Sequence, residues 1–140
     1  MLIRKHLGNR GAKAYIYEPS GTTPIYSKTT DLFTNANDDL ELDLSDFSYN
    51  RNNLYDIKIE IANYLHKKIF NHNLVDDITI PQTLKIGNLD NTDQEINSSD
   101  WGVMLSKWGT ADPDADFNED GLVNTIDWAW MNRNWLSIGD

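Results

Sequence analysis

The stretch Asp116-Phe-Asn-Glu-Asp-Gly-Leu-Val-Asn-Thr-Ile-Asp127 decides how this chain is interpreted. It places side-chain oxygens at its first, third, fifth and twelfth positions and a glycine at its sixth. A loop that surrounds Ca²⁺ needs this spacing, because alternate residues turn their oxygens inward and the glycine allows a sharp bend. The alternative, a solvated acidic turn, needs no such register. The predicted ligands are Asp116, Asn118, Asp120, the Leu122 carbonyl, Asn124 (directly or through a water) and Asp127.

The same pattern occurs in a second copy that lies 27 residues earlier in the chain. Asp100 aligns with Asp127 at the end of the loop, and Trp101 aligns with Trp128 directly after it. An internal repeat of this kind predicts two units of one design. We therefore expect each copy to be a calcium loop followed by a helix.

Tryptophan and methionine recur after each loop with the three-to-four-residue spacing of one helix face. The first copy has Trp101, Met104, Leu105 and Trp108, and the second has Trp128, Met131 and Trp135. We expect the repeated tryptophans to form the core between two short helices. Gly109 stands where the end of the first helix is expected.

The first loop departs from the pattern. Counting back twelve residues from Asp100 places Leu89 first, and leucine has no side-chain oxygen. One inserted residue restores a complete set of ligands, but Gln94 then stands where glycine belongs, so the bend is strained or reshaped. The predicted ligands are Asn88, Asp90, Asp93, the Glu95 carbonyl, Asn97 and Asp100; without the insertion, Asn91 replaces Asp90. We expect this loop to bind calcium more weakly than the second.

Charge is distributed unevenly along the 140 residues, whose net charge is −10. Residues 88–140 carry 11 acidic and 2 basic side chains, and residues 1–87 are nearly neutral. This balance argues against nucleic acid or an anionic membrane as the partner, because both attract a basic face. The sequence contains no long apolar run that predicts a membrane span, and no cysteine for disulfide or thiol chemistry.

The first 85 residues are predicted to form an antiparallel β-sandwich. Apolar and polar residues alternate strictly over residues 39–44 and 55–61, as in strands with one face exposed to water. Further strands are predicted over residues 13–18, 24–29, 64–70 and 75–80. The acids that alternate with apolar residues are interpreted as the solvated face. We find no catalytic constellation here, so the chain is predicted not to be an enzyme.

Two stretches of this half resemble a known family. Leu54-Tyr-Asp-Ile-Lys-Ile-Glu-Ile61, followed by Asn63-Tyr-Leu-His-Lys-Lys-Ile69, is similar to the last strands of carboxypeptidase-regulatory-like sandwich modules. Asn63 takes the place of the usual glycine. The resemblance implies an immunoglobulin-like, non-catalytic spacer or binding module over residues 1–85.

Residues 86–136 resemble a dockerin module, which has two calcium loops, each followed by one helix and without the entering helix of an EF-hand. The matching stretches are Gly87-Asn-Leu-Asp90, Ile96-Asn-Ser-Ser-Asp100 and residues 116–127, with the tails Met104-Leu-Ser-Lys-Trp-Gly109 and Met131-Asn-Arg-Asn-Trp135. The expected fold class is therefore two small domains: the sandwich of residues 1–85 and an all-α dockerin-like pair of loop–helix motifs over residues 86–140.

The dockerin resemblance implies two bound Ca²⁺ ions and a cohesin-like protein partner. It implies an extracellular or cell-surface protein attached to a scaffold, as in cellulosome-like assemblies for polysaccharide degradation. Family contacts cluster before the closing acid of each loop and along the next helix. The implied partner-binding residues are Ser98, Ser99, Leu105 and Ser106 in the first copy and Thr125, Ile126, Asn132 and Arg133 in the second. Because the two sets differ chemically, we expect one binding orientation.

Other functions stay open at the level of sequence. A calcium-stiffened stalk or self-assembling subunit of a surface layer would use the same loops without a cohesin. A carbohydrate-binding or enzymatic role of the sandwich ranks lower, because the sequence shows no paired catalytic carboxylates. An intracellular calcium sensor would need full helix–loop–helix units and a Met-rich groove, and the chain has three methionines.

We predict that Asp120→Ala weakens calcium binding more than Asp93→Ala does, because the second loop has the complete pattern. Titration calorimetry of both variants measures the two affinities. The reverse order would show that the loops are ranked wrongly.

Overall fold

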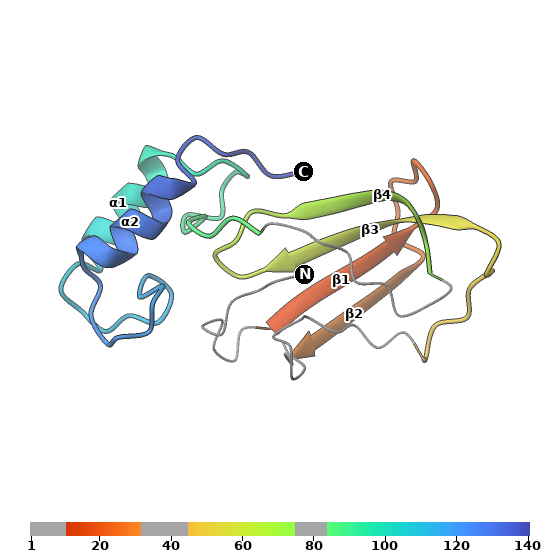
Figure 1. The fold of residues 1–140 in the computed structure, drawn as a ribbon, viewed down its shortest axis with the longest axis horizontal. Coiled ribbons are helices and arrows are strands. Elements are labelled where there is room, and N and C mark those ends of the chain that lie inside the picture. Colours follow the sequence, from red (N-terminus) through yellow and green to blue (C-terminus); the bar gives the residue numbers. More distant parts are fainter. Residues whose placement is uncertain (1–10, 32–44, 75–83) are drawn as a thin grey trace. The chain divides into compact units, whose positions relative to one another are not determined.

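The computed structural model describes residues 11–31, 45–74 and 84–140 and divides the chain into two compact units. Unit 1 comprises residues 1–61 and 67–83, and unit 2 comprises residues 62–66 and 84–140. Unit 1 contains the strands β1 (Gly11–Tyr17), β2 (Tyr26–Asp31), β3 (Leu54–Ile61) and β4 (Lys67–Asn73). Unit 2 contains the helices α1 (Ser98–Ser106) and α2 (Thr125–Arg133) (Figure 1).

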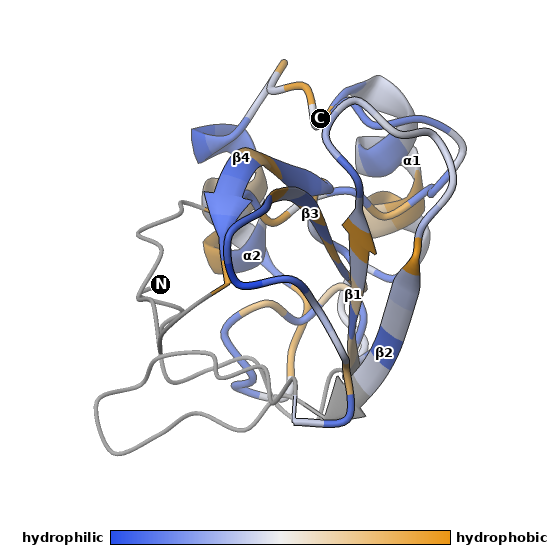
Figure 2. Cartoon of the chain, turned by 90° about the vertical axis from the view of Figure 1, so that its right-hand side faces the viewer, coloured by the Kyte–Doolittle hydropathy of each residue, from blue (hydrophilic) through white to orange (hydrophobic). Residues whose placement is uncertain are grey.

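The strands of unit 1 form one antiparallel sheet in the order β2-β1-β3-β4. Ile57 of β3 lies opposite Ile16 of β1 and Ile69 of β4, so the apolar face predicted for residues 55–61 is continuous across the sheet. Hydrophobic and hydrophilic residues are mixed along the strands in Figure 2, as expected of a sheet with one buried face. The buried core of this face consists of Ile16, Tyr55, Ile57, Ile69 and Leu74.

One acid of the alternating strands is not solvated, contrary to the sequence interpretation. Asp56 is only 1% exposed. Its carboxylate accepts hydrogen bonds from the backbone N–H groups of Ser20 (3.1 Å) and Asn71 (2.9 Å), and Lys68 Nζ lies 3.8 Å away. Both N–H donors belong to residues with positive φ, 62° and 53°. The Asp56 carboxylate therefore holds two left-handed turns that the backbone would otherwise disfavour.

The helices of unit 2 are nine residues each, too short to be stable alone in water. Their burial in a common core stabilises them. Met104 and Met131 are completely buried, as are Ile96 and Val123, the eighth-position residues of the two loops. Neither helix is long and apolar enough to cross a membrane, among the residues that the structure describes.

The repeated tryptophans were expected to form the core between the helices, but they do not lie at its centre. They make a row of contacting rings in the order Trp108, Trp101, Trp128, Trp135, with centroid separations of 5.7, 4.3 and 5.3 Å. Trp108 is 39% exposed and the other three are half-buried. The methionines belong to the buried cluster, and Trp101, Trp128 and Trp135 pack against it from outside.

The predicted fold class, an N-terminal β-sandwich joined to a C-terminal all-α pair, is wrong. Most of the regular secondary structure in the described residues is one four-stranded sheet, accompanied by two short helices. The strands predicted over residues 39–44 and 75–80 lie outside the described residues.

Each helix is followed by a residue with positive φ, which pairs with the loop of the other copy. Gly109 (φ 76°) donates to the Val123 carbonyl at 2.9 Å, and Leu136 (φ 57°) donates to the Ile96 carbonyl at 2.8 Å. The copies therefore cross-brace each other's loops. Glycine adopts this conformation freely, but a leucine does so at a cost of about 1–2 kcal/mol.

We predict that Leu136→Gly stabilises unit 2 by about 1 kcal/mol, because it removes the left-handed strain from a side chain that is 64% exposed. The matched change Gly109→Leu is expected to destabilise it by about the same amount. Urea unfolding followed by tryptophan fluorescence measures both, since all five tryptophans lie in residues 101–135. A less stable Leu136→Gly protein would contradict the strain argument.

Candidate metal centre

The second loop is organised around the carboxylate of Asp116, which is 5% exposed. Its oxygens accept hydrogen bonds from the backbone N–H groups of Asp120 (3.2 Å) and Gly121 (2.8 Å). Gly121 has a φ of 88°, so the sixth position makes the left-handed bend for which a calcium loop uses glycine. The Asp116 carboxylate thereby holds the backbone of the bend at positions five and six.

The last residue of this loop ties it to α2. Asp127 is fully buried, and its Oδ1 accepts from the N–H groups of Phe117 (2.7 Å) and Asn118 (3.3 Å) at the start of the loop. Its Oδ2 accepts from the Asn124 N–H at 2.9 Å. Asp127 is also the third residue of α2 and completes a capping box with Asn124. A single carboxylate thus joins both ends of the loop to the first turn of the helix.

Asn124 serves the helix as well as the loop. Its Oδ1 accepts from the Ile126 N–H at 2.7 Å, and its Nδ2 donates to the Leu122 carbonyl at 2.9 Å. With the side-chain oxygen engaged as a cap, the ninth position fits contact with an ion through a water better than direct ligation. The Leu122 carbonyl points to the same side of the loop as Asn124.

The first loop repeats the closing arrangement. Asp100 is fully buried, its Oδ1 accepts from the N–H groups of Leu89 (2.7 Å) and Asp90 (3.1 Å), and its Oδ2 accepts from Asn97 (2.8 Å). These bonds match those of Asp127, so Leu89 is equivalent to Phe117 of the second loop. Asn88 therefore occupies the first position and Asp90 the third. This is the alignment with one inserted residue, in which Asn91 is not a ligand.

The bend of the first loop is rebuilt around the insertion. Asn91 has a φ of 53°, like its counterpart Glu119 at 59°, and no other described residue of the first loop has a positive φ. Gln94 therefore does not adopt the left-handed conformation of Gly121. The extra residue completes the bend without a glycine, and Asp93 still accepts the N–H of Glu95 at 2.8 Å.

The side-chain oxygen of buried Asn88 lacks a hydrogen-bond partner. Asn88 is 1% exposed, and its Oδ1 has no donor within hydrogen-bond distance. An unpaired buried oxygen costs about 1–3 kcal/mol. A cation at the first position of the loop would remove that cost, so the residues present fit Ca²⁺ in the first loop as well as in the second.

The acids of the loops do not form a metal site alone. In the described part of the chain, no group of three or more His, Asp or Glu side chains could hold a metal ion. The predicted sets mix carboxylates with amide and backbone oxygens, the hard oxygen ligands that Ca²⁺ accepts and that most transition metals do not favour.

The eight predicted partner-binding residues all lie on the surface. Two of them are apolar and half exposed, Leu105 (50%) and Ile126 (49%). The remaining six are exposed polar residues: Ser98, Ser99, Ser106, Thr125, Asn132 and Arg133. Trp108 and Leu122, which are not among these eight residues, are also 39% and 46% exposed.

Comparison with known proteins places this geometry in context. No protein-family model matches the chain, and no curated protein matches it in sequence. A crystal structure of a type II cohesin–X–dockerin complex from Acetivibrio cellulolyticus, an N-terminal interface mutant, matches with a TM-score of 0.64 at 20% identity, over 99% of this chain and 90% of that chain. A C-terminal interface mutant of the same kind of complex matches with a TM-score of 0.65 at 24% identity, over 96% and 86%. These likenesses show the fold.

The comparison corrects the recognition of this protein as a dockerin module preceded by a carboxypeptidase-regulatory-like sandwich. The likeness to the cohesin–X–dockerin structures extends over nearly the whole chain and is not confined to residues 86–136. The largest described element is a four-stranded antiparallel sheet, which a dockerin-like pair of loop–helix motifs does not contain. The short loop motifs did not define the family of the chain.

We predict that Asn88→Leu has opposite effects with and without calcium. In chelator it stabilises the protein or leaves it unchanged, because it removes an unpaired buried oxygen and adds apolar contact. In saturating calcium it is less stable than the unchanged protein, because the first loop loses a ligand. Thermal unfolding in calcium and in EGTA measures both effects, and equal destabilisation in the two buffers would contradict a metal ligand at Asn88.

Proposed function

We propose that this chain is a non-catalytic, calcium-dependent protein-interaction module of the cohesin–dockerin type, and that unit 2 binds a cohesin-like module. The observation that carries the proposal is the position of Asp100 and Asp127. Each is a predicted calcium ligand, and each also caps the helix that carries predicted partner-binding residues. An ion in a loop would therefore set the position of an interaction surface.

Electrostatics supports the calcium requirement. Residues 88–140 carry 11 acidic and 2 basic side chains, which repel one another in the folded state without a metal. Two Ca²⁺ ions would neutralise four of these charges. At about a thousandfold excess over Kd, a ligand that binds only the folded state stabilises it by about 4 kcal/mol. Free calcium outside cells fills such sites, so we place the protein in the extracellular space or at the cell surface.

The helices offer a surface of mixed chemistry to this partner. Ile126 of α2 takes the place of Ser99 of α1, and Leu105 of α1 takes the place of Asn132 of α2. Each helix therefore presents one half-exposed aliphatic side chain, but at a different end. Apolar anchors of this kind contribute much of the affinity in protein interfaces. A partner shaped to this pattern would bind in one orientation and reject the orientation related by the repeat.

We predict that binding to a panel of cohesin-like modules occurs in calcium and is lost in EGTA. Leu105→Glu and Ile126→Glu are each expected to weaken binding at least tenfold, because a charge replaces an apolar anchor that the partner would bury. Phe70→Glu is the matched control, since Phe70 is 59% exposed on β4 of unit 1. Surface plasmon resonance measures the affinities, with circular dichroism as a check of folding.

Two results would contradict the proposal. Binding that persists in EGTA would show that calcium is not required. Equal losses for all three variants would show that the partner does not bind specifically to the helix surface. Concentration-dependent assembly of the purified chain with no captured module would instead favour a structural subunit.

A further inference from the structure

Residues 62–66, here termed the strap, connect β3 to β4 but belong to unit 2. Tyr64 forms an antiparallel bridge with Ile86, and the Leu65 N–H donates to the Lys85 carbonyl at 2.9 Å. Leu65 is 4% exposed and lies in the same buried cluster as the loop and helix residues. The strap is therefore a structural part of the calcium-loop unit, although it precedes the repeat by about 20 residues.

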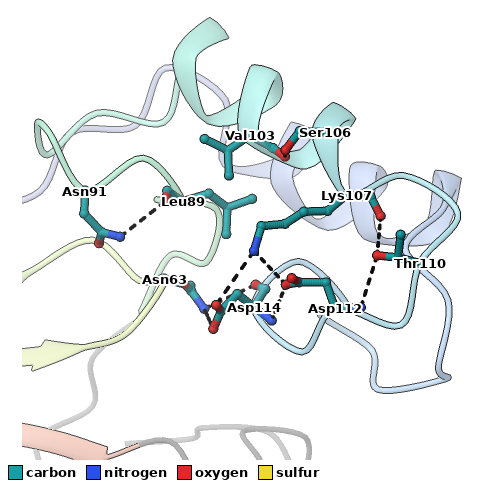
Figure 3. Close-up of polar contacts among 9 residues, drawn as sticks. All are labelled: Asn63, Leu89, Asn91, Val103, Ser106, Lys107, Thr110, Asp112 and Asp114. Carbon is teal, nitrogen blue, oxygen red and sulfur yellow. Dashed lines mark hydrogen bonds and ion pairs between the residues drawn. The ribbon is translucent and has the colours of Figure 1, made fainter.

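Asn63 of the strap contacts the beginnings of both loops. Its carbonyl accepts from the N–H groups of Gly87 (2.9 Å) and Asn88 (3.1 Å), and Asn88 is the first position of the first loop. Its Nδ2 donates to the Asp114 carbonyl at 3.2 Å, two residues before the first position of the second loop (Figure 3). Asn63 is 5% exposed with a φ of 67°, a conformation that asparagine tolerates better than most residues.

The segment that Asn63 holds is itself ordered by Lys107. The Lys107 ammonium lies 2.8 Å from Asp112 Oδ1 and 3.8 Å from Asp114 Oδ2 (Figure 3). The hydrogen bond from Lys107 lowers the pKa of the Asp112 carboxyl. The Asp112 carbonyl in turn accepts the Asp116 N–H at 2.9 Å. The approach to the second loop is thus fixed by the end of α1 and by the strap together.

Gln94 ties the strap to the middle of the first loop. Its Oε1 accepts the His66 N–H at 2.8 Å, and its carbonyl accepts the Gly139 N–H at 2.7 Å. Gln94 is the residue that replaces the expected glycine. Gln94 does not have the positive φ of Gly121. Its side chain instead attaches the loop to the strap through the hydrogen bond from His66.

The first loop needs this attachment more than the second does. In the second loop the Asp116 carboxylate braces the bend by accepting the N–H groups of Asp120 and Gly121. In the first loop the Asn88 oxygen accepts no hydrogen bond. The second loop is therefore braced by its own first residue, and the first loop is braced by its hydrogen bond to the strap.

We infer that the strap is a positioning element for calcium binding, in which Gln94 orients the first loop and Asn63 orients the approach to the second. This inference rests on the proposed function, because it assumes that both loops bind calcium. It assigns Gln94 a role that the calcium-loop pattern does not contain.

The test uses the full chain in two single-site backgrounds, Asp120→Ala to leave the first loop and Asp93→Ala to leave the second. Loss of one hydrogen bond is expected to weaken the affected site about three- to tenfold. Gln94→Met keeps the length of the side chain and removes the acceptor, so it weakens calcium binding in the first background and not in the second. Asn63→Gly keeps the left-handed backbone and removes the amide, so it has the larger effect in the second background. Titration calorimetry measures each affinity.

Gln94→Gly separates positioning from simple strain. It installs the residue that the second loop carries, and we expect it to weaken calcium binding at the first loop as Gln94→Met does. Tighter binding of Gln94→Gly would overturn the inference, as would equal effects of Gln94→Met in both backgrounds or no effect in either. If the unchanged protein binds no calcium at all, it is the proposed function that fails.

Discussion

The folding of unit 2 depends on two buried carboxylates, those of Asp100 and Asp127. Each is completely inaccessible to solvent and accepts three backbone N–H groups. A buried charge is tolerated only where hydrogen bonds or an opposite charge compensate the lost hydration. The same bonds join the start of a loop to the start of a helix, so the loop and the helix form together. Removing either carboxylate would release both.

Unit 1 uses the same device for another purpose. The Asp56 carboxylate accepts N–H groups from Ser20 and Asn71, and it holds two left-handed residues in place at the sheet. In the described part of both units, buried aspartates accept backbone N–H groups of turns and loops. Acidic residues therefore stabilise the backbone in both units of a chain whose net charge is −10.

Sequence reasoning reached the features that spacing alone determines. The glycine bend within residues 116–127 and the helix after each loop follow from spacing, and the structure has both. Periodicity placed Leu105 on the apolar face of its helix, whereas the structure leaves it half exposed. The burial of Asp56 could not be predicted, because strand alternation places it on the outer face and only its distant donors explain it. The family was misjudged because two loop motifs carried the recognition, whereas the sheet dominates the described fold.

The role of the strap was beyond sequence reasoning for a related reason. Asn63 was noted only as a departure from a sandwich pattern and Gln94 only as a departure from a loop pattern. The strap explains both departures. Asn63 belongs to it, and the Gln94 side chain binds it by accepting the His66 N–H. The first loop therefore takes part of its geometry from the strap, a segment outside the repeat, in place of the glycine that bends the second loop.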